Sequence, residues 1–227
     1  MAYFTDDFIK FFQELAENNH KQWFDEHRKR YEKNIKAPFK ALVEDMILRI
    51  HADDPEVMIP AKDAIFRINR DIRFSRDKRL YKTQMSAVIS PAGRKDLGLP
   101  GFYFELNANR IMIGGGAHTC DKDRLQAIRG YIVAKPDEFK KALSDKTFRD
   151  KFGEIRGEKN KRLPAEFRER AETEPLLFNK QFYFMAELPP KIITDDRLGD
   201  VLMEYYFAGK PLMGFLRKAI FYQAHSS

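Results

Sequence analysis

The sequence predicts an α+β fold, with a central, mainly antiparallel sheet flanked by N-terminal and C-terminal helices. Three observations support this prediction. Apolar residues recur at helical spacing towards both ends of the chain, and short apolar segments between turn residues occupy its middle. The composition is 43% hydrophobic and 13% aromatic, enough to build a core despite 33% charged residues. We therefore expect residues 1–227 to form a single domain.

The N-terminal region predicts helices. Thr5 or Asp6 can cap a helix whose apolar residues share one face and which ends near residues 18–19. A second helical stretch begins at about Lys21. Pro38 marks the start of a further helix, because proline is tolerated in a first turn.

Short strands are predicted in the middle of the chain, at residues 64–68, 85–89, 102–106 and 110–113. The last two are joined by Asn107-Ala108-Asn109. Asparagine tolerates the left-handed conformation that a tight turn requires, so these two segments predict a hairpin. One more strand is expected at residues 182–185.

Helices are predicted again in the second half, at residues 123–134 and from Pro136 onwards. Residues 153–164 contain glycine and proline among charges and predict a surface loop. The last helical stretch should start at residues 194–196 and reach about Gln223. We expect a break in it near Gly209–Pro211, because both residue types disfavour a helix interior.

Several classes of protein are disfavoured. No apolar run approaches the roughly 20 residues that span a bilayer, and residues 1–7 lack the basic and apolar regions of a secretory signal. We therefore expect a cytoplasmic protein without a membrane span. Cys120 is the only cysteine, so no disulfide or cysteine-based zinc site can form within one chain. The five histidines show no metal-ligand spacing, and no motif identifies a cofactor, a reaction or an oligomeric state.

The most informative segment is residues 62–82. It carries eight basic and three acidic side chains, so +5 of the formal charge of +7 lies here. Apolar residues are interleaved with these charges, which means that the segment must also pack. Some of the arginines are therefore expected to be held in fixed positions.

Positioned guanidinium groups bind phosphate or carboxylate through paired donors and stay charged at any working pH. We expect Arg67, Arg70 and Arg73 to bind a phosphate-bearing or other anionic small molecule. The protein would then be either a binding protein for this molecule or an enzyme that acts on it. The neighbouring residues that would orient these arginines or add contacts to the ligand are Asp71, Asp77, Lys78, Tyr81 and Lys82. Alternate side chains of a strand point oppositely, so the three arginines can converge only if the chain bends between Asn69 and Phe74.

Two alternatives stay open for the same segment. It could bind nucleic acid, with the cations along the phosphates and an exposed Tyr81, Phe74 or Trp23 stacked on bases. A steep loss of affinity with salt would distinguish that function from a confined anion site. Alternatively, the arginines and aspartates form an ion-pair network whose role is purely structural.

Other residues are weaker candidates. Trp23 and His27 share one helix face, so Trp23 could line the ligand site and His27 could act as a general base. Asp71 and Tyr81 are the other catalytic candidates. The remaining ones could cradle an anion, supply a nucleophile or add a positive charge: Gly114-Gly115-Gly116, Cys120, Arg129 and Lys180.

The basic segment also carries a resemblance. Its pattern reads Arg67-x-x-Arg70-Asp71-x-Arg73-Phe74-Ser75-x-Asp77-Lys78-x-x-Tyr81-Lys82. This pattern resembles the signature of an uncharacterised family of bacterial proteins, domain of unknown function 2461. Further landmarks are Asn18-Asn19-His20-Lys21-x-Trp23-Phe24, Pro100-Gly101-Phe102-Tyr103-Phe104 and the triple glycine. The resemblance covers the chain from about Thr5 to Pro211 and implies a family-length domain, without an activity.

Overall fold

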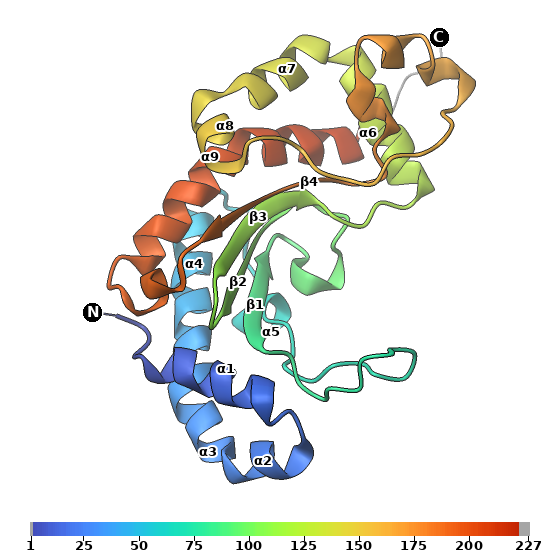
Figure 1. The fold of residues 1–227 in the computed structure, drawn as a ribbon. Helices are drawn as coiled ribbons and strands as arrows, with labels where there is room; N and C mark the ends of the chain where they lie inside the picture. Colours follow the sequence, from blue (N-terminus) through green and yellow to red (C-terminus); the bar gives the residue numbers. More distant parts are fainter. Residues whose placement is uncertain (1, 223–227) are drawn as a thin grey trace. The chain divides into compact units, whose positions relative to one another are not determined.

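The computed structural model describes residues 2–222 and confirms the α+β fold, with helices near both ends and an antiparallel sheet between them (Figure 1). The strands are β1 (Gln84–Ile89), β2 (Gly101–Asn107), β3 (Ile111–Ala117) and β4 (Phe182–Leu188). Their order in the sheet is β1-β2-β3-β4, the order of the sequence. β4 pairs with β3 although residues 118–181 separate them along the chain.

The chain divides into two compact units. The first consists of Met1–Arg94, Tyr103–Ile113 and Glu187–Glu204, and the second of Lys95–Phe102, Gly114–Ala186 and Tyr205–Ser227. The whole basic segment belongs to the first unit. The single domain expected for residues 1–227 stays a prediction.

The N-terminal helices of the first unit follow the sequence pattern closely. They are α1 (Asp7–Glu17), α2 (Lys21–Glu26), α3 (Arg28–Arg30), a π-helical turn (Tyr31–Lys36) and α4 (Ala37–Asp53). Pro38 lies in the first turn of α4, as expected. The apolar residues of these helices face inwards and are buried. The aromatic ones among them that are buried include Phe8, Phe11, Phe12, Phe24 and Phe39.

The strand predicted at residues 64–68 is wrong. Ala61–Ala64 form a short helix, α5, and the chain then pairs with β1 only through an isolated bridge between Ile65 and Ala87. The N–H of Phe66 adds one hydrogen bond to the carbonyl of Ser86 at 2.9 Å. The apolar residues of this stretch predict a strand. The pairing ends after Phe66, however, because the chain then leaves the edge of the sheet.

The hairpin of β2 and β3 is confirmed, but its turn works differently from the prediction. No residue other than glycine has a positive φ in the part of the chain that the structure describes. The Asn107 side chain instead accepts hydrogen bonds from the N–H groups of Asn109, at 2.8 Å, and Arg110, at 3.0 Å. The turn therefore depends on the asparagine oxygen and not on a left-handed backbone.

The second unit contains the expected helices, α6 (Lys122–Ala134) and α7 (Pro136–Ser144), and one that the sequence analysis missed, α8 (Lys146–Phe152). Phe148 and Phe152 of α8 pack on Phe184 of β4, with ring centroids 5.1 and 4.6 Å apart. Residues 153–164 form the predicted irregular loop. Short 3-10 turns of this unit are Ala165–Phe167, Arg170–Glu172 and Pro175–Phe178; a further one, Pro190–Thr194, lies in the first unit, and Gly93–Lys95 lies where the chain passes from the first unit to the second.

The predicted break in the last helix is also wrong. Helix α9 runs without interruption over Leu198–Ile220, with Pro211 in its interior. A Cβ atom on Gly209 would lie 2.7 Å from the Phe184 ring, so glycine allows this helix to approach the ring closely. Tertiary packing thus outweighs the helix-breaking tendency of both residues. The expected end near Gln223 lies outside the described residues.

Candidate functional site

Residues 66–83, here called the basic loop, leave the sheet edge between α5 and β1 and return to it (Figure 1). The base of the loop is paired: an antiparallel bridge joins Asn69 to Tyr81, and the N–H of Arg70 donates to the Leu80 carbonyl at 2.9 Å. The chain bends at Arg73 and Phe74, where a departure from a straight strand was expected. Two short pairings thus hold the ends of an otherwise irregular loop.

A side-chain clamp fixes the loop to the N-terminal helices. Asn19, in the α1–α2 connection, donates to the carbonyl of Tyr81 at 3.0 Å and accepts from its N–H at 2.9 Å. The Tyr81 ring is buried and stacks on Phe24 with centroids 4.0 Å apart. Both asparagine and tyrosine belong to the motifs noted in the sequence, and the structure gives them an anchoring position.

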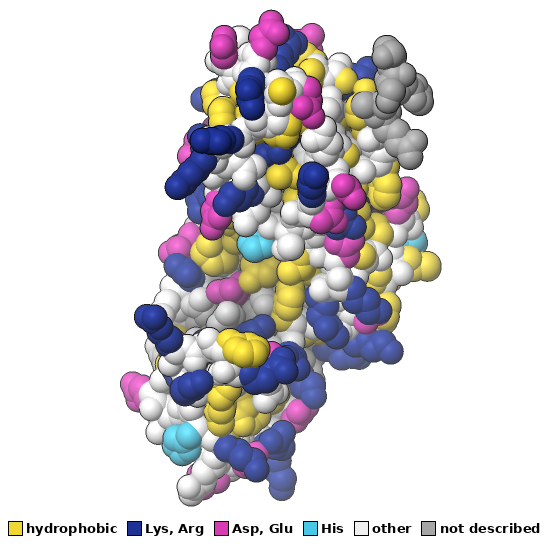
Figure 2. All heavy atoms as spheres, turned by 90° about the vertical axis from the view of Figure 1, so that its right-hand side faces the viewer, with side chains coloured by type: hydrophobic (Ala, Val, Ile, Leu, Met, Phe, Trp, Pro, Cys, Tyr) yellow, Lys and Arg dark blue, Asp and Glu magenta, His cyan; other side chains and the backbone are white. Residues whose placement is uncertain are grey.

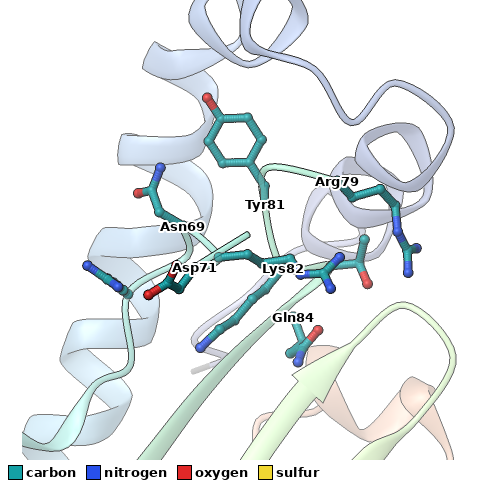
Figure 3. Close-up of a pocket in the computed structure, with 9 residues that line it drawn as sticks. Asn69, Asp71, Arg79, Tyr81, Lys82 and Gln84 are labelled. Atoms are coloured by element: carbon teal, nitrogen blue, oxygen red, sulfur yellow. The ribbon is translucent and has the colours of Figure 1, made fainter. Parts of the chain in front are cut away.

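The basic loop borders a hollow of about 550 Å³ (Figure 3). Its lining consists of Arg67, Asn69, Arg70, Asp71, Arg79, Tyr81, Lys82, Thr83 and Gln84. Figure 3 shows that Lys82 lies in the middle of this region, whereas the Tyr81 ring points away from Lys82. Four cations and one aspartate therefore surround the same space, and Tyr81 borders it without pointing its ring there.

Ion pairs organise one side of this hollow. Asp77 pairs with Arg70 at 2.5 Å and with Arg79 at 2.7 Å. The hydrogen bonds from Arg79 and then from Arg70 lower the pKa of Asp77 far below its usual range. Asp77 itself does not line the hollow, but it forms ion pairs with two arginines that do. Asp77 thus contacts two of the arginines that line the hollow, and its role in orienting them towards a ligand stays a prediction.

Arg73 and Lys78 lie outside the hollows of the basic loop. Arg73 is 77% exposed and pairs with Asp71 at 2.7 Å, and this hydrogen bonding lowers the pKa of Asp71. The Lys78 ammonium donates to the Ile72 carbonyl at 3.1 Å and closes the tip of the loop. The convergence expected of three arginines therefore holds for Arg67 and Arg70 but not for Arg73, because Asp71 pairs with Arg73 at the tip.

Arg67 and Lys82 differ from these residues because neither forms an ion pair with an acid within residues 2–222. The Lys82 ammonium is partly buried and lies 5.2 Å from the centre of the Phe66 ring. Burial and then the charge of Arg67 lower the pKa of Lys82, and the carboxylate of Glu105 opposes this shift with a smaller effect. The pair thus holds two like charges close together, and neither of them forms an ion pair with the nearby acids Asp71 and Glu105.

A second hollow, of about 650 Å³, shares Arg67 and Lys82 with the first. Its other cations come from α4, α5 and the turns beside them: Lys36, Lys40, Lys62 and Arg94. Its apolar lining consists of Tyr31, Ile65, Phe66, Ile68 and Met85. No acidic residue lines this hollow within the described chain. Lys36, Lys40 and Arg94 could not be identified from the sequence, because they are remote from the motif and only the fold brings them to it.

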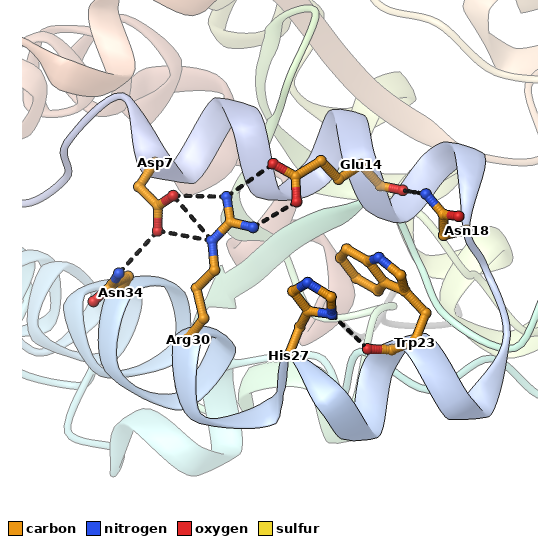
Figure 4. A network of polar contacts seen from close by, with 7 residues as sticks. All are labelled: Asp7, Glu14, Asn18, Trp23, His27, Arg30 and Asn34. Carbon is orange, nitrogen blue, oxygen red and sulfur yellow. Dashed lines mark hydrogen bonds and ion pairs between the residues drawn. The ribbon is translucent and has the colours of Figure 1, made fainter.

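The candidates on the N-terminal helices lie in a separate network (Figure 4). His27 stacks on Trp23 with ring centroids 4.0 Å apart, and its Nδ1 lies 2.8 Å from the Trp23 carbonyl. Beside them, Arg30 pairs with Asp7 at 2.7 Å and with Glu14 at 2.5 Å. Trp23 and His27 line neither of the two hollows. The structure therefore does not bring these two residues together with the basic loop.

The remaining candidates all lie in the second unit. Gly114–Gly116 are part of strand β3, and a Cβ on Gly114 or Gly116 would lie 2.2 Å from a carbonyl oxygen of β4. The glycines thus permit close strand pairing, which leaves no open anion cradle there. Burial raises the pKa of Cys120 to about 11, so its thiol is protonated at neutral pH.

Two basic residues of the second unit have partners of their own. Arg129 is buried and donates to the carbonyls of Leu177 and Asn179 at 2.8 and 3.2 Å. Lys180 pairs with Glu158 at 3.3 Å. Neither residue lines either hollow of the basic loop.

Among residues 2–222, no group of three or more His, Cys, Asp and Glu side chains could hold a metal ion. Within the same range, no helix has the length and apolar character needed to cross a membrane.

Comparison with known proteins gives one match. No curated protein and no solved structure matches the chain. A family model described as conserved hypothetical protein (DUF2461) matches residues 7–215, which include the Asn19 clamp, the basic loop and both hollows. This chain therefore belongs to the DUF2461 family of conserved hypothetical proteins.

Proposed function

We propose that this protein binds a small anion, in particular a phosphate-bearing molecule, at the cleft formed by the two hollows that share Arg67 and Lys82. The observation that carries the proposal is the position of Arg67 and Lys82 beside each other in this cleft. Both cations line both hollows, and neither forms an ion pair with an acid in the described residues. Three other arginines of the basic loop, Arg70, Arg73 and Arg79, form ion pairs with aspartates, so they are less available to a ligand.

The energetics favour an anionic ligand. Holding a partly buried ammonium beside a guanidinium costs free energy, because burial and like charge both disfavour the charged amine. A bound anion would remove that cost and form charge-assisted hydrogen bonds with both groups. The lowered pKa of Lys82 is thus the feature that a phosphate would reverse.

The pairing of Asp77 with Arg70 and Arg79 supports the same function. Side chains held by an ion pair lose little conformational freedom when a ligand arrives. The clamp between Asn19 and Tyr81 fixes the backbone next to Lys82 in a similar way. The wall of the first hollow is therefore ordered before the ligand binds.

The proposal can be tested by calorimetric titration of the protein with inorganic phosphate and with pyrophosphate. We expect Arg67→Met and Lys82→Met each to weaken binding by at least about tenfold, because each variant loses one charge-assisted contact. Arg110→Met is the matched control. Its guanidinium is exposed and pairs with Glu187 at 3.1 Å in the same unit, so its loss should leave affinity unchanged.

Chemical modification provides a second measurement. The Lys82 amine should react with an acylating reagent, and saturating pyrophosphate should slow this reaction, as followed by mass spectrometry. Wild-type protein that binds neither anion, or binding that is equal in wild type and both variants, would contradict the proposal. Modification of Lys82 that is unaffected by pyrophosphate would contradict it as well.

Nucleic-acid binding is a second candidate, and one observation favours it. Phe74, at the tip of the basic loop, is 97% exposed, and the Arg73 guanidinium lies 6.0 Å from the centre of its ring. The loop projects to the right in Figure 1 and faces the viewer in Figure 2, where Lys and Arg side chains gather beside hydrophobic ones. Tyr81 and Trp23 are less suited to base stacking, because their rings already stack on Phe24 and His27.

The two candidates give different results with a single-stranded oligonucleotide. If the loop tip binds bases, Phe74→Ser should weaken oligonucleotide binding by about fivefold or more, and affinity should fall steeply with salt. Phosphate binding in the cleft should be unaffected by the same variant. Oligonucleotide binding that is unchanged in Phe74→Ser would exclude the loop tip as a base-stacking site.

A further inference from the structure

The second hollow combines two kinds of surface. Tyr31, Ile68 and Met85 in its lining are buried, and Ile65 and Phe66 are half-buried, so an apolar floor is available to a ligand. Cations surround that floor. An inorganic anion would use only the cations, because burying apolar surface requires an apolar group on the ligand.

The size of the cleft points the same way. Pockets of about 300–1,000 Å³ hold molecules of drug size. The hollows measure about 550 and 650 Å³ and share Arg67 and Lys82. A single phosphate group placed between these two cations would leave most of both hollows unfilled.

The charges around the floor also select the kind of apolar group. Cations stabilise the face of an aromatic ring, and a guanidinium can stack on a flat ring, whereas a saturated chain gains nothing from either contact. Arg94 and Lys62 lie together at this hollow, with the Arg94 Nε donating to the Lys62 carbonyl at 3.4 Å. A flat aromatic ring therefore suits this hollow better than an acyl chain.

From these observations we infer that the ligand belongs to the nucleotide class, a phosphate ester that carries a flat heteroaromatic ring. The ring occupies the second hollow, over Ile65 and Phe66. The phosphate lies between Arg67 and Lys82 and extends towards Arg70 in the first hollow. This inference rests on the proposed function, since it assigns the anion site to the phosphate of the same ligand.

The test compares four kinds of probe by calorimetry: inorganic phosphate, an alkyl phosphate, a nucleoside, and the corresponding nucleoside monophosphate. We expect the monophosphate to bind at least about tenfold more tightly than phosphate, because base stacking adds to the phosphate contacts. A purine and a pyrimidine nucleotide are both used, so that preference for one ring size does not hide binding.

The outcomes separate the inference from the proposed function. If phosphate binds and neither nucleotide binds more tightly, the nucleotide inference is wrong and the anion site stands. If neither phosphate nor nucleotides bind, both are wrong. Tighter binding of an alkyl phosphate than of the nucleotides would also overturn the inference, because it would assign the apolar floor to a chain.

Variants locate the ring. Phe66→Leu keeps an apolar side chain but removes the aromatic surface, so it should reduce the advantage of the nucleotide over phosphate at least about threefold while phosphate binding persists. Arg94→Met should act in the same direction. Met58→Ala is the control, since Met58 is 77% exposed, belongs to the same unit and lines neither hollow. Equal losses for phosphate and nucleotide in Phe66→Leu would contradict the placement of the ring.

Discussion

Arg30 and Arg67 lie in the same unit of this protein, but their surroundings differ. Arg30 is held by Asp7 and Glu14, with five hydrogen bonds between the guanidinium and the two carboxylates (Figure 4). Arg67 has the cation Lys82 and the more weakly interacting Asp71 as charged neighbours, and it forms no ion pair in the described residues. The first arginine is saturated by the protein, and the second is not.

The difference shows how a cation that the fold stabilises can be distinguished from one whose charge the fold disfavours. Hydrogen bonding to Asp7 and then to Glu14 raises the pKa of Arg30 well above its usual value, so folding favours its charge. The environment of Lys82 beside Arg67 has the opposite effect on a positive charge. A cation that the fold favours contributes to stability, whereas one that the fold disfavours needs another reason to be there, and a ligand is one.

The largest effect should come from Arg30→Met. This variant leaves the carboxylates of Asp7 and Glu14 without their partner, and we expect it to lower the free energy of unfolding by about 2 kcal/mol. That value includes a reduction for solvent screening, because Glu14 is 43% exposed. Urea denaturation measures the change, and phosphate affinity should be unaffected.

Arg28→Met is the control for this prediction. Arg28 lies two residues away and pairs with Asp25, but its side chain is 56% exposed. We expect no measurable change in stability, because exposed pairs contribute little. Equal losses in both variants would show that the contrast between the saturated and the exposed pair is wrong.

The pH dependence of the same network should be the next largest effect. Hydrogen bonds from Arg30 lower the pKa of Asp7 and of Glu14. Their stabilisation is present above the unfolded values, about 3.9 and 4.3, and is lost as pH falls through the lower folded values. The stability difference between wild type and Arg30→Met should therefore shrink between pH 7 and pH 3. A difference that is constant with pH would contradict the ionic origin of this stabilisation.

The smallest effect should come from Lys82→Met, and its sign is opposite. Removing a disfavoured charge while keeping an apolar side chain should raise the free energy of unfolding by about 0.5 kcal/mol at pH 7. Because the folded pKa of Lys82 is lowered, the cost of its charge is present below that pKa and fades as pH rises towards 10.5. The gain should therefore decrease from pH 7 to pH 10, as measured by urea denaturation.

A loss of stability in Lys82→Met would contradict the comparison. It would mean that the protein itself stabilises the Lys82 charge, as it does that of Arg30. The cleft would then have no unsatisfied charge for an anion to neutralise.

Local patterns in the sequence were enough to predict much of the fold. Two patterns predicted their elements correctly: the helical spacing before residue 50 and the apolar segments of the β2–β3 hairpin. Each pattern repeats over several residues, so its combined effect on the local structure is larger than that of any single tertiary contact. Pro211 shows where this fails. A proline disfavours a helix by a few kcal/mol, and packing on both sides of it outweighs that cost.

By itself, the sequence determined where the charge is concentrated, because the density of basic residues between Lys62 and Lys82 does not depend on folding. Only the tertiary structure decided which of these charges are available. Asp77 pairs with Arg70 and Arg79 because the loop folds back. Lys36 and Lys40 reach the same cleft as Arg67 from 27 or more residues earlier in the chain. Pairing depends on distances in space of a few ångströms, and a sequence records only separations along the chain.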